Sequence, residues 1–219
     1  MLRNIIIRPE TPADYHAVEI LTRDAFWNLH VPGCDEHYLA HTLRSSDAFI
    51  PELDLVAELG GEIIGNIMYA RTVILSRDGS SHPVLVFGPL SVKPERQGEG
   101  IGSLLVRQSL FLAREMGHQA VVIYGDPDFY KRFGFSPARE YGIYTPYKTC
   151  SPALQVLELV PGSLKGISGA FEEGEAYHLD PEEAAAFDLL FEPREKGFQE
   201  SQLRFQEILA ASVPIETCE

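Results

Sequence analysis

The sequence predicts an α+β (mixed α/β) fold that contains one β-α-β crossover unit, and three observations support this. The element order along the chain is strand, helices, antiparallel strands, and then strand, helix, strand, helix, strand. The almost wholly apolar segment 83–92 has the length and composition of a central strand covered on both faces. Internal repeats and low-complexity runs are absent from the sequence, which argues against a repetitive doubly wound sheet.

The composition excludes several classes of partner. The 219 residues carry 18 Lys and Arg against 32 Asp and Glu, for a net charge of −14. A polyanion of this size is repelled by nucleic acids and anionic lipids unless a basic patch is present. The nearest approaches to such a patch, Lys93 with Arg96 and Lys131-Arg132, hold only two charges each. No apolar window approaches a membrane-spanning length, and the N-terminal apolar stretch is too short for a signal peptide. We therefore predict a cytoplasmic protein that binds neither nucleic acid nor membrane.

The cysteines argue against a disulfide framework and against zinc. Cys34, Cys150 and Cys218 are widely spaced, odd in number and contain no CxxC pair. We expect three reduced thiols and no metal site.

The N-terminal third begins with a strand and two helices. Residues 4–8 form the expected strand, and the helix after it begins at Pro12 with Thr11 as its N-cap and Asp14 in the first turn. A short second helix is expected at residues 36–43.

Antiparallel hairpins follow. A turn at Gly60-Gly61 separates the predicted strand 54–59 from the next stretch, 62–69, which runs on to 73–75. A second turn at Asp78-Gly79 leads to the central strand 83–92. Gly88-Pro89 interrupts this central strand, because proline has no N–H to donate and glycine has no side chain to pack. The break leaves backbone groups unpaired and available to a ligand.

The crossover unit comes after this strand. It consists of a loop at 93–100, a helix at 101–117, a strand at 120–124, a short helix at 126–134 capped by Asp126 and ended by Gly134, and a strand at 154–160.

The C-terminal end differs in composition from the rest. Residues 171–219 hold 13 acidic and 3 basic residues and contain two amphipathic helical segments, 181–191 and 201–211. We expect a domain at 1–169 and an acidic helical extension at 170–219. The extension packs on the domain, forms a dimer contact or covers the active site.

A glycine-rich loop carries the strongest functional signal. Residues 97–103 read Gln-Gly-Glu-Gly-Ile-Gly-Ser and lie between a buried strand and an amphipathic helix. Glycine lets the backbone approach a ligand closely, and the first N–H groups of a helix lack intrahelical partners, so the junction suits a phosphate or pyrophosphate. The P-loop pattern fails for want of Lys-Ser or Lys-Thr after the glycines, and the dinucleotide fingerprint fails at Ser103. A glycine-rich turn without a ligand is the alternative.

Two motifs in order resemble the GNAT superfamily of acyl-CoA-dependent N-acetyltransferases. Gln97-x-x-Gly100-x-Gly102 begins the crossover helix, and Phe129-Tyr130 with Gly134-Phe135 follows one helix and one strand later. The resemblance covers about residues 3–160. The segments 87–94, 125–127 and 132–135 are most similar to the YhbS-like bacterial members. The resemblance implies a central twisted, mostly antiparallel sheet with flanking helices and a crossover that binds acetyl-CoA.

The resemblance also implies roles for particular residues. Tyr130 would protonate the departing thiolate, although a packed aromatic is the simpler interpretation. The cofactor-binding set would comprise the pantetheine-pairing residues Leu90, Ser91 and Val92, the pyrophosphate loop Gln97, Gly98, Glu99, Gly100, Ile101, Gly102 and Ser103, and Asp126 and Arg132. For Asp126 an N-cap, and for Arg132 and Lys93 solvated surface charges, are the alternatives.

The sequence leaves the general base and the acceptor open. The strand 84–92 contains no titratable side chain, so His82, Asp24 and Glu36 are candidates by chemistry only, and a water chain would also serve. The implied activity is transfer of the acetyl group of acetyl-CoA, with no metal, to a primary amine of a small molecule or peptide by direct attack in a ternary complex. A homodimer is possible. A non-catalytic acyl-CoA-binding or regulatory module is the alternative.

Overall fold

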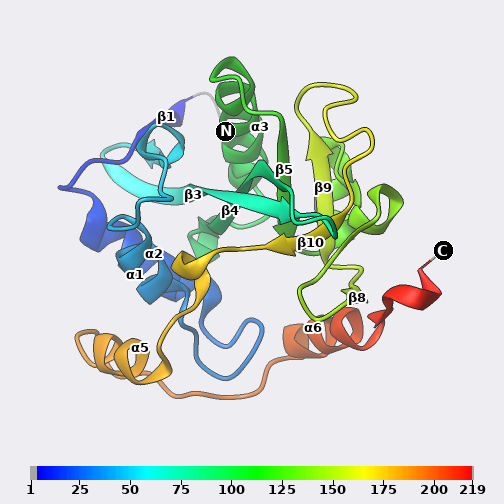
Figure 1. The fold of residues 1–219 in the computed structure, drawn as a ribbon. Coiled ribbons are helices and arrows are strands. Elements are labelled where there is room, and N and C mark those ends of the chain that lie inside the picture. The colour runs from blue at the N-terminus through cyan, green and yellow to red at the C-terminus, as the bar shows by residue number, and fades with distance from the viewer. Residues whose placement is uncertain (1–3, 219) are drawn as a thin grey trace. The chain divides into compact units, whose positions relative to one another are not determined.

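The computed structural model describes residues 4–218, and Figure 1 shows its elements. In chain order the helices and strands are β1 (Ile6–Pro9), α1 (Tyr15–Phe26), α2 (Glu36–Leu43), β2 (Leu55–Leu59), β3 (Glu62–Leu75), β4 (Ser81–Val92), α3 (Ile101–Glu115), β5 (Ala120–Tyr124), α4 (Pro127–Tyr130), β6 (Ser136–Pro137), β7 (Ile143–Tyr144), β8 (Thr149–Cys150), β9 (Leu154–Glu158), β10 (Gly169–Glu172), α5 (Pro181–Asp188), α6 (Glu200–Ala210) and β11 (Val213–Pro214). Short 3-10 helices are η2 (Pro51–Leu53), η3 (Pro94–Arg96), η4 (Lys131–Phe133), η5 (Ala138–Tyr141), η6 (Glu175–Tyr177) and η7 (Ile215–Thr217).

The main sheet has nine strands in the order β1-β2-β3-β4-β5-β9-β6, with β10 paired to β3 and to β7. β4 and β5 run parallel, as the crossover through α3 requires, and β7 and β10 are also parallel. The pairs β1–β2, β2–β3, β3–β10, β5–β9 and β6–β9 are antiparallel. The predicted mixed fold, with a mostly antiparallel sheet and a β-α-β crossover, is confirmed.

The chain divides into two compact units. The first contains residues 4–70, 88–109 and 175–202, and the second contains residues 71–87, 110–174 and 203–218. Four elements, β3, β4, α3 and α6, contribute residues to both units.

In the first unit, α1 and α2 pack against each other and α5 lies beside α2 (Figure 1). The ring of Phe187 on α5 contacts the rings of Tyr38 and His41 on α2, at 5.3 and 4.6 Å between ring centroids. The start of the first helix differs from the prediction by three residues: α1 begins at Tyr15 and not at Pro12. The hydroxyl of Thr11, the predicted N-cap, donates to the Asp14 carboxylate, which also accepts from Arg8 at 2.7 and 2.9 Å. The same contact holds the pKa of Asp14 well below its usual range.

Hydrogen bonds connect residues 188–195 of the C-terminal region to α1 and its C-cap within this unit. Buried Arg23 donates from Nε to Asp188 at 2.7 Å. Trp27 Nε1 donates to the carbonyl oxygen of Glu195 at 3.0 Å. These contacts join segments more than 160 residues apart and hold residues 188–195 against the helix.

The second unit has its core around β5, whose residues 120–123 are fully buried. β10, which the sequence did not indicate, adds Phe171, with no exposed surface, to this core. Gly169 at the start of β10 lies so close to the backbone of Leu75 that a Cβ atom at this position would clash with the Leu75 carbonyl. The close approach explains the glycine.

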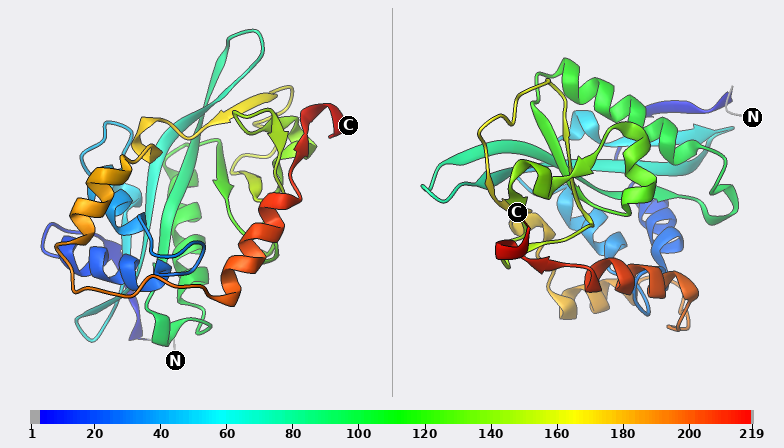
Figure 2. Two further views of the ribbon diagram at one scale, coloured as in Figure 1. Left: turned by 90° about the horizontal axis from the view of Figure 1, so that it is seen from below. Right: turned by 90° about the vertical axis from the view of Figure 1, so that its right-hand side faces the viewer.

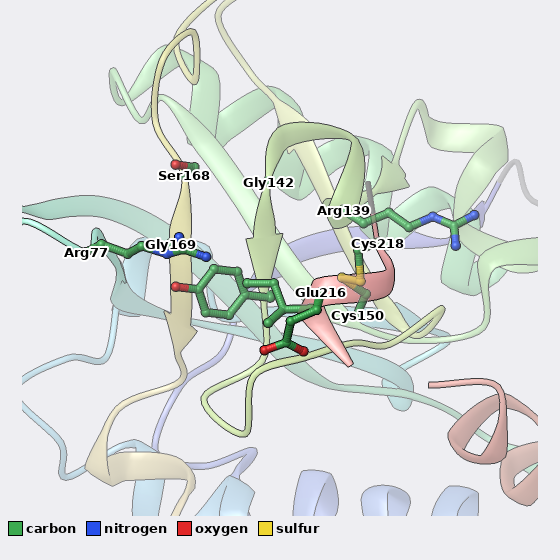
Figure 3. Close-up of a pocket in the computed structure, with 10 residues that line it drawn as sticks. Arg77, Arg139, Gly142, Cys150, Ser168, Gly169, Glu216 and Cys218 are labelled. Atoms are coloured by element: carbon green, nitrogen blue, oxygen red, sulfur yellow. A yellow bond between two sulfur atoms is a disulfide. The ribbon is translucent and has the colours of Figure 1, made fainter. Parts of the chain in front are cut away.

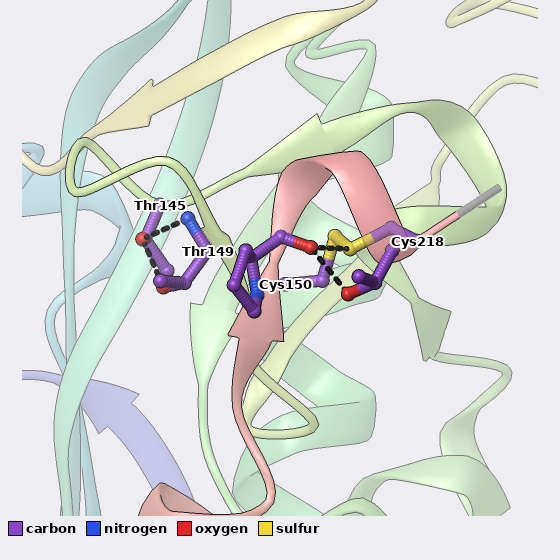
Figure 4. Close-up of a disulfide and its surroundings, with 6 residues drawn as sticks. Thr145, Thr149, Cys150 and Cys218 are labelled. Atoms are coloured by element: carbon purple, nitrogen blue, oxygen red, sulfur yellow. Dashed lines mark hydrogen bonds between the residues drawn. A yellow bond between two sulfur atoms is a disulfide. The ribbon is translucent and has the colours of Figure 1, made fainter.

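A disulfide corrects the expected state of the cysteines. Cys150 and Cys218 are bonded, and β11 pairs antiparallel with β8 directly beside them (Figure 4). Figure 2 shows α6 continuing into the C-terminal segment, and this segment contains Cys218. The prediction of three reduced thiols is therefore wrong for this pair, whose 68-residue separation gives no local signal, while Cys34 is free and buried.

Candidate functional site

The glycine-rich loop forms the predicted junction between η3 and α3 in the first unit. Gly98 and Gly100 have φ values of +80° and +91°, a region that side-chain-bearing residues rarely adopt. The first backbone hydrogen bond of the helix runs from Leu104 N to Gly100 O at 3.0 Å. Among residues 4–218, no backbone acceptor pairs with the amide groups of Gly98, Gly100, Ile101, Gly102 and Ser103. Unpaired amides at the positive end of a helix fit an anion of pyrophosphate size.

The two longer side chains of the loop support it from within. Gln97 Nε2 donates to the carbonyl oxygen of Val92 at 3.2 Å, and Glu99 accepts from Arg96 at 3.3 Å. The loop therefore offers its backbone to a ligand, and the side chains of Gln97 and Glu99 hold its shape.

The strand break lies at the end of β4 in the same unit. The Gly88-Pro89 peptide bond is cis, and Gly88 has a φ of +155°. A Cβ atom added to Gly88 would meet nothing within 4 Å, so one side of the break is open. After the break, Ser91 is fully buried and its hydroxyl bonds to that of Thr22 at 3.0 Å, whereas the neighbouring Leu90 and Val92 are half-buried.

Close packing positions the loop relative to this strand. A Cβ atom at Gly65 on β3 would lie 3.2 Å from the carbonyl oxygen of Ser91 and 3.1 Å from Cγ2 of Ile101. The glycine thus lets β3, the end of β4 and the first turn of α3 approach one another. Sequence reasoning did not select Gly65, although a glycine inside a predicted strand is a signal for such an approach.

Tyr130, the predicted acid, lies in an aromatic cluster of the second unit. Its ring packs near Phe87, Phe129 and Phe135, with ring centroids 5.7, 4.8 and 5.7 Å away. Burial raises its pKa above the usual value of a phenol, so the hydroxyl is protonated at neutral pH. Within the described residues 4–218 the hydroxyl has no hydrogen-bond partner, and it is free to donate to a ligand.

Asp126 caps the helix that carries Tyr130. Its carboxylate accepts from Asp128 N at 2.8 Å, as the sequence predicts for an N-cap, and it also pairs with Arg204 of α6 at 3.2 Å. The exposed Arg132 guanidinium stacks on the ring of Phe129 at 4.9 Å. Asp126, Tyr130 and Arg132 therefore all lie on or beside α4 and η4.

The candidate bases and Lys93 are all engaged elsewhere. His82 shares hydrogen bonds with Ser76 and Ser80 at 3.0 and 3.1 Å. Asp24 is ion-paired with Arg194, Glu36 lies 3.7 Å from His30, and Lys93 is ion-paired with Glu62. None of these observed contacts assigns a base to the reaction.

A surface cavity of about 710 Å³ occupies another part of the second unit (Figure 3). Arg77, Arg139, Glu216 and the disulfide contribute to its wall, and no residue of the predicted site lines it. The guanidinium groups of Arg77 and Arg139 point in different directions in Figure 3, so they do not converge on one ligand position.

Within residues 4–218 no helix is long and apolar enough to span a membrane. The same part of the chain contains no group of His, Cys, Asp and Glu side chains arranged to hold a metal ion.

Comparison with known proteins agrees with these features. An acetyltransferase (GNAT) domain model matches residues 52–137. A GNAT family acetyltransferase from Brucella melitensis, crystallised with acetyl-CoA, is 30% identical with a TM-score of 0.64, and the match covers 79% of this chain and 97% of that one. The GNAT family N-acetyltransferase YhbS from Escherichia coli, crystallised with CoA, is 29% identical with a TM-score of 0.71, covering 80% and 93%. A search of curated proteins finds no match.

The chain belongs to the GNAT family of acetyltransferases and is an acyltransferase. The matched segment contains the glycine-rich loop, the strand break and Tyr130.

Proposed function

We propose that this acyltransferase is an acetyl-CoA-dependent N-acetyltransferase in which a primary amine attacks the thioester directly within a ternary complex. The observation that carries the proposal is the row of unpaired amide groups at the start of α3. This row, with the positive φ values of Gly98 and Gly100, fits the pyrophosphate of coenzyme A. The CoA and acetyl-CoA held by the two related crystal structures support the same ligand.

The groups of the chain divide the work of binding and proton transfer. Acetyl-CoA supplies an acyl group activated as a thioester. The unpaired amides of Gly98 and of residues 100–103 bind the pyrophosphate, and the backbone of Leu90–Val92 pairs with the amide groups of the pantetheine arm as an added strand. As the nitrogen–carbon bond forms and the carbon–sulfur bond breaks, Tyr130 donates its proton to the departing thiolate. Exposed Arg132 contributes a positive charge for the CoA phosphates, and Asp126 serves by capping α4.

The amine loses a proton before or during attack, and we propose that water carries this proton to solvent. The lack of a titratable side chain in 84–92 and the engagement of His82, Asp24 and Glu36 support this route. A relay through water is sufficient, because the proton leaves an ordinary ammonium group.

The acceptor is a primary amine of a small molecule or a peptide, and a homodimer remains a prediction.

We further propose that residues 170–219 form an extension that packs on the acetyltransferase domain of residues 1–169. The cytoplasmic location also remains a prediction, and the Cys150–Cys218 disulfide counts against it, because such bonds persist mainly in oxidising compartments.

Titration calorimetry with acetyl-CoA, CoA and NADH tests the ligand. We expect both CoA compounds to bind and NADH to give no heat, because the loop fits the pyrophosphate but lacks the dinucleotide fingerprint. Binding of NADH, or no binding of either CoA compound, would refute the proposal. A protein that binds acetyl-CoA but releases no thiol with any amine would instead be the non-catalytic binding module.

A further inference from the structure

The C-terminal region supplies a side chain to the strand break. The hydroxyl of Tyr177 on η6 donates to the carbonyl oxygen of Gly88 at 3.2 Å, within the first unit. The two residues are separated by 89 positions in the sequence, and η6 lies beyond the segment that the GNAT domain model matches.

The carbonyl of Gly88 lies at the strand break, directly before the backbone that is proposed to pair with the pantetheine arm. It belongs to the peptide bond of Gly88 and Pro89, where proline provides no N–H and glycine provides no side chain to restrain the backbone. The hydroxyl of Tyr177 therefore gives this peptide group a side-chain hydrogen bond that restrains the direction of its carbonyl. That peptide group is followed directly by Leu90, Ser91 and Val92.

The support for Tyr177 is itself well anchored. η6 packs against α2, and further along the chain the carboxylate of Glu183 accepts a hydrogen bond from the hydroxyl of Tyr38 on α2 at 2.7 Å. Tyr177 is half-buried, and the open space on the Cβ side of Gly88 leaves the break accessible. The phenol is thus presented to the break by a segment that α2 holds in place.

We propose that Tyr177 is a positioning residue for acyl transfer, whose hydroxyl orients the Gly88-Pro89 peptide and through it the backbone of Leu90–Val92. The inference rests on the proposed function, which gives that backbone to the thioester-bearing arm. The C-terminal extension thereby completes the acyl site as well as adding to the fold. Tyr177 itself transfers no proton and forms no bond to substrate.

Tyr177→Phe tests the inference, because it removes the hydroxyl and keeps the ring. The control is Tyr147→Phe, the same substitution at a tyrosine that is 88% exposed. For all three proteins, calorimetry gives the acetyl-CoA dissociation constant. NMR gives the acetyl-CoA-induced shifts of the Leu90 and Ser91 amides. Thiol release is measured with the most effective amine of a panel and with water as the acceptor.

We expect Tyr177→Phe to bind acetyl-CoA within about twofold of the unaltered chain, to change the ligand-induced shift at Leu90, and to lower kcat about fivefold, the size of one hydrogen bond. Tyr147→Phe keeps the shift and the rate. Two results would overturn this inference and leave the proposed function standing. In one, Tyr177→Phe has the rate and the amide shifts of the unaltered chain. In the other, both variants lose kcat equally. Failure of the unaltered chain to bind acetyl-CoA would refute the proposed function first, and the inference with it.

Discussion

The ring of Tyr130 lies directly against the backbone of Gly125, so closely that a Cβ atom at this position would overlap the ring. Gly125 follows β5, and its backbone is held on both sides: its N–H donates to Ala153 O at 2.9 Å and its carbonyl accepts from Gln155 Nε2 at 2.9 Å. Because the backbone is fixed in this way, a side chain at 125 has to displace the tyrosine.

Gly125→Ala is therefore expected to move Tyr130 and to lower both stability and turnover. Overpacking of this kind costs about 1–3 kcal/mol, measurable by denaturant unfolding. Gly197→Ala is the control, because a Cβ atom there meets only Asn28 Nδ2, at 4.0 Å. If Gly125→Ala matches the control in unfolding free energy and thiol release, the close contact does not position Tyr130.

Tyr130→Phe is expected to lower kcat by roughly 10² while leaving acetyl-CoA affinity unchanged, because only the proton donor is lost. The comparison is Tyr147→Phe, since Tyr147 is 88% exposed. Stopped-flow thiol release and calorimetry separate the two effects. A loss of affinity equal to the loss of rate would assign Tyr130 to binding.

The raised pKa of Tyr130 also predicts how kcat depends on pH. Burial disfavours the phenolate, so the hydroxyl stays protonated through the ordinary range of a phenol, near pH 10. Any fall of kcat with rising pH below about pH 10 therefore comes from another group. We expect the same fall at the same pH in Tyr130→Phe, as measured by the pH dependence of kcat.

Gly98→Glu is expected to reduce CoA affinity at least about a hundredfold, because it places negative charge among the amides that bind the pyrophosphate. Gly60→Glu is a matched control. Gly60 also has a positive φ, +61°, and neither glycine has an atom within 4 Å of an added Cβ. Both variants place the same charge on a backbone with positive φ, and calorimetry should distinguish them. Equal affinity in the two variants would remove the loop from the site.

Stability is expected to fall as the pH rises because of Asp54. Asp54 is 3% exposed, and its carboxyl accepts a hydrogen bond from Asn66 Nδ2 at 2.9 Å. Burial, with Glu10 beside it, raises the pKa of this carboxyl. The folded protein thus keeps a proton that the unfolded chain releases above its ordinary pKa near 3.9. Between that value and the raised pKa, the unfolding free energy decreases with pH, by at most about 1.4 kcal/mol per unit.

Asp54→Asn should flatten this dependence, as measured by urea unfolding between pH 5 and pH 8. The exposed Glu52→Gln variant serves as the control and should retain the slope of the unaltered chain. The same slope in Asp54→Asn and in the unaltered chain would show that Asp54 is ionised in the folded state.

Reduction of the Cys150–Cys218 bond is expected to destabilise the second unit by about 2–4 kcal/mol, because a long loop in the unfolded chain is released. Alkylation followed by mass spectrometry provides the check. Before reduction no thiol should react, since burial raises the pKa of Cys34; afterwards two sites should be modified. Modification of Cys150 and Cys218 without reductant, or an unchanged melting temperature after reduction, would contradict the bond.

The sequence was most informative where the structure depends on local chemistry. The loop at 97–103 was predictable because alternating glycines and an amphipathic helix are both read over a few residues. The cap at Asp126 and the stop at Gly134, with a φ of +93°, follow from the same local rules.

Long-range contacts account for what the sequence did not predict. One example is β10, which is stabilised by pairing with β3 about 100 residues away in the sequence. The contact of Tyr177 with Gly88 and the disulfide join residues with no shared motif. Such pairings depend on the folded topology, and a single sequence carries no local signal for them.

The most direct test of the central claim is the rate of CoA thiol release from acetyl-CoA with and without a panel of primary amines, with the mass of the product determined in the same reaction. We predict amine-dependent release and an amine product heavier by one acetyl group. Release that no amine accelerates, or transfer of the acetyl group to an acceptor other than an amine nitrogen, would contradict the account.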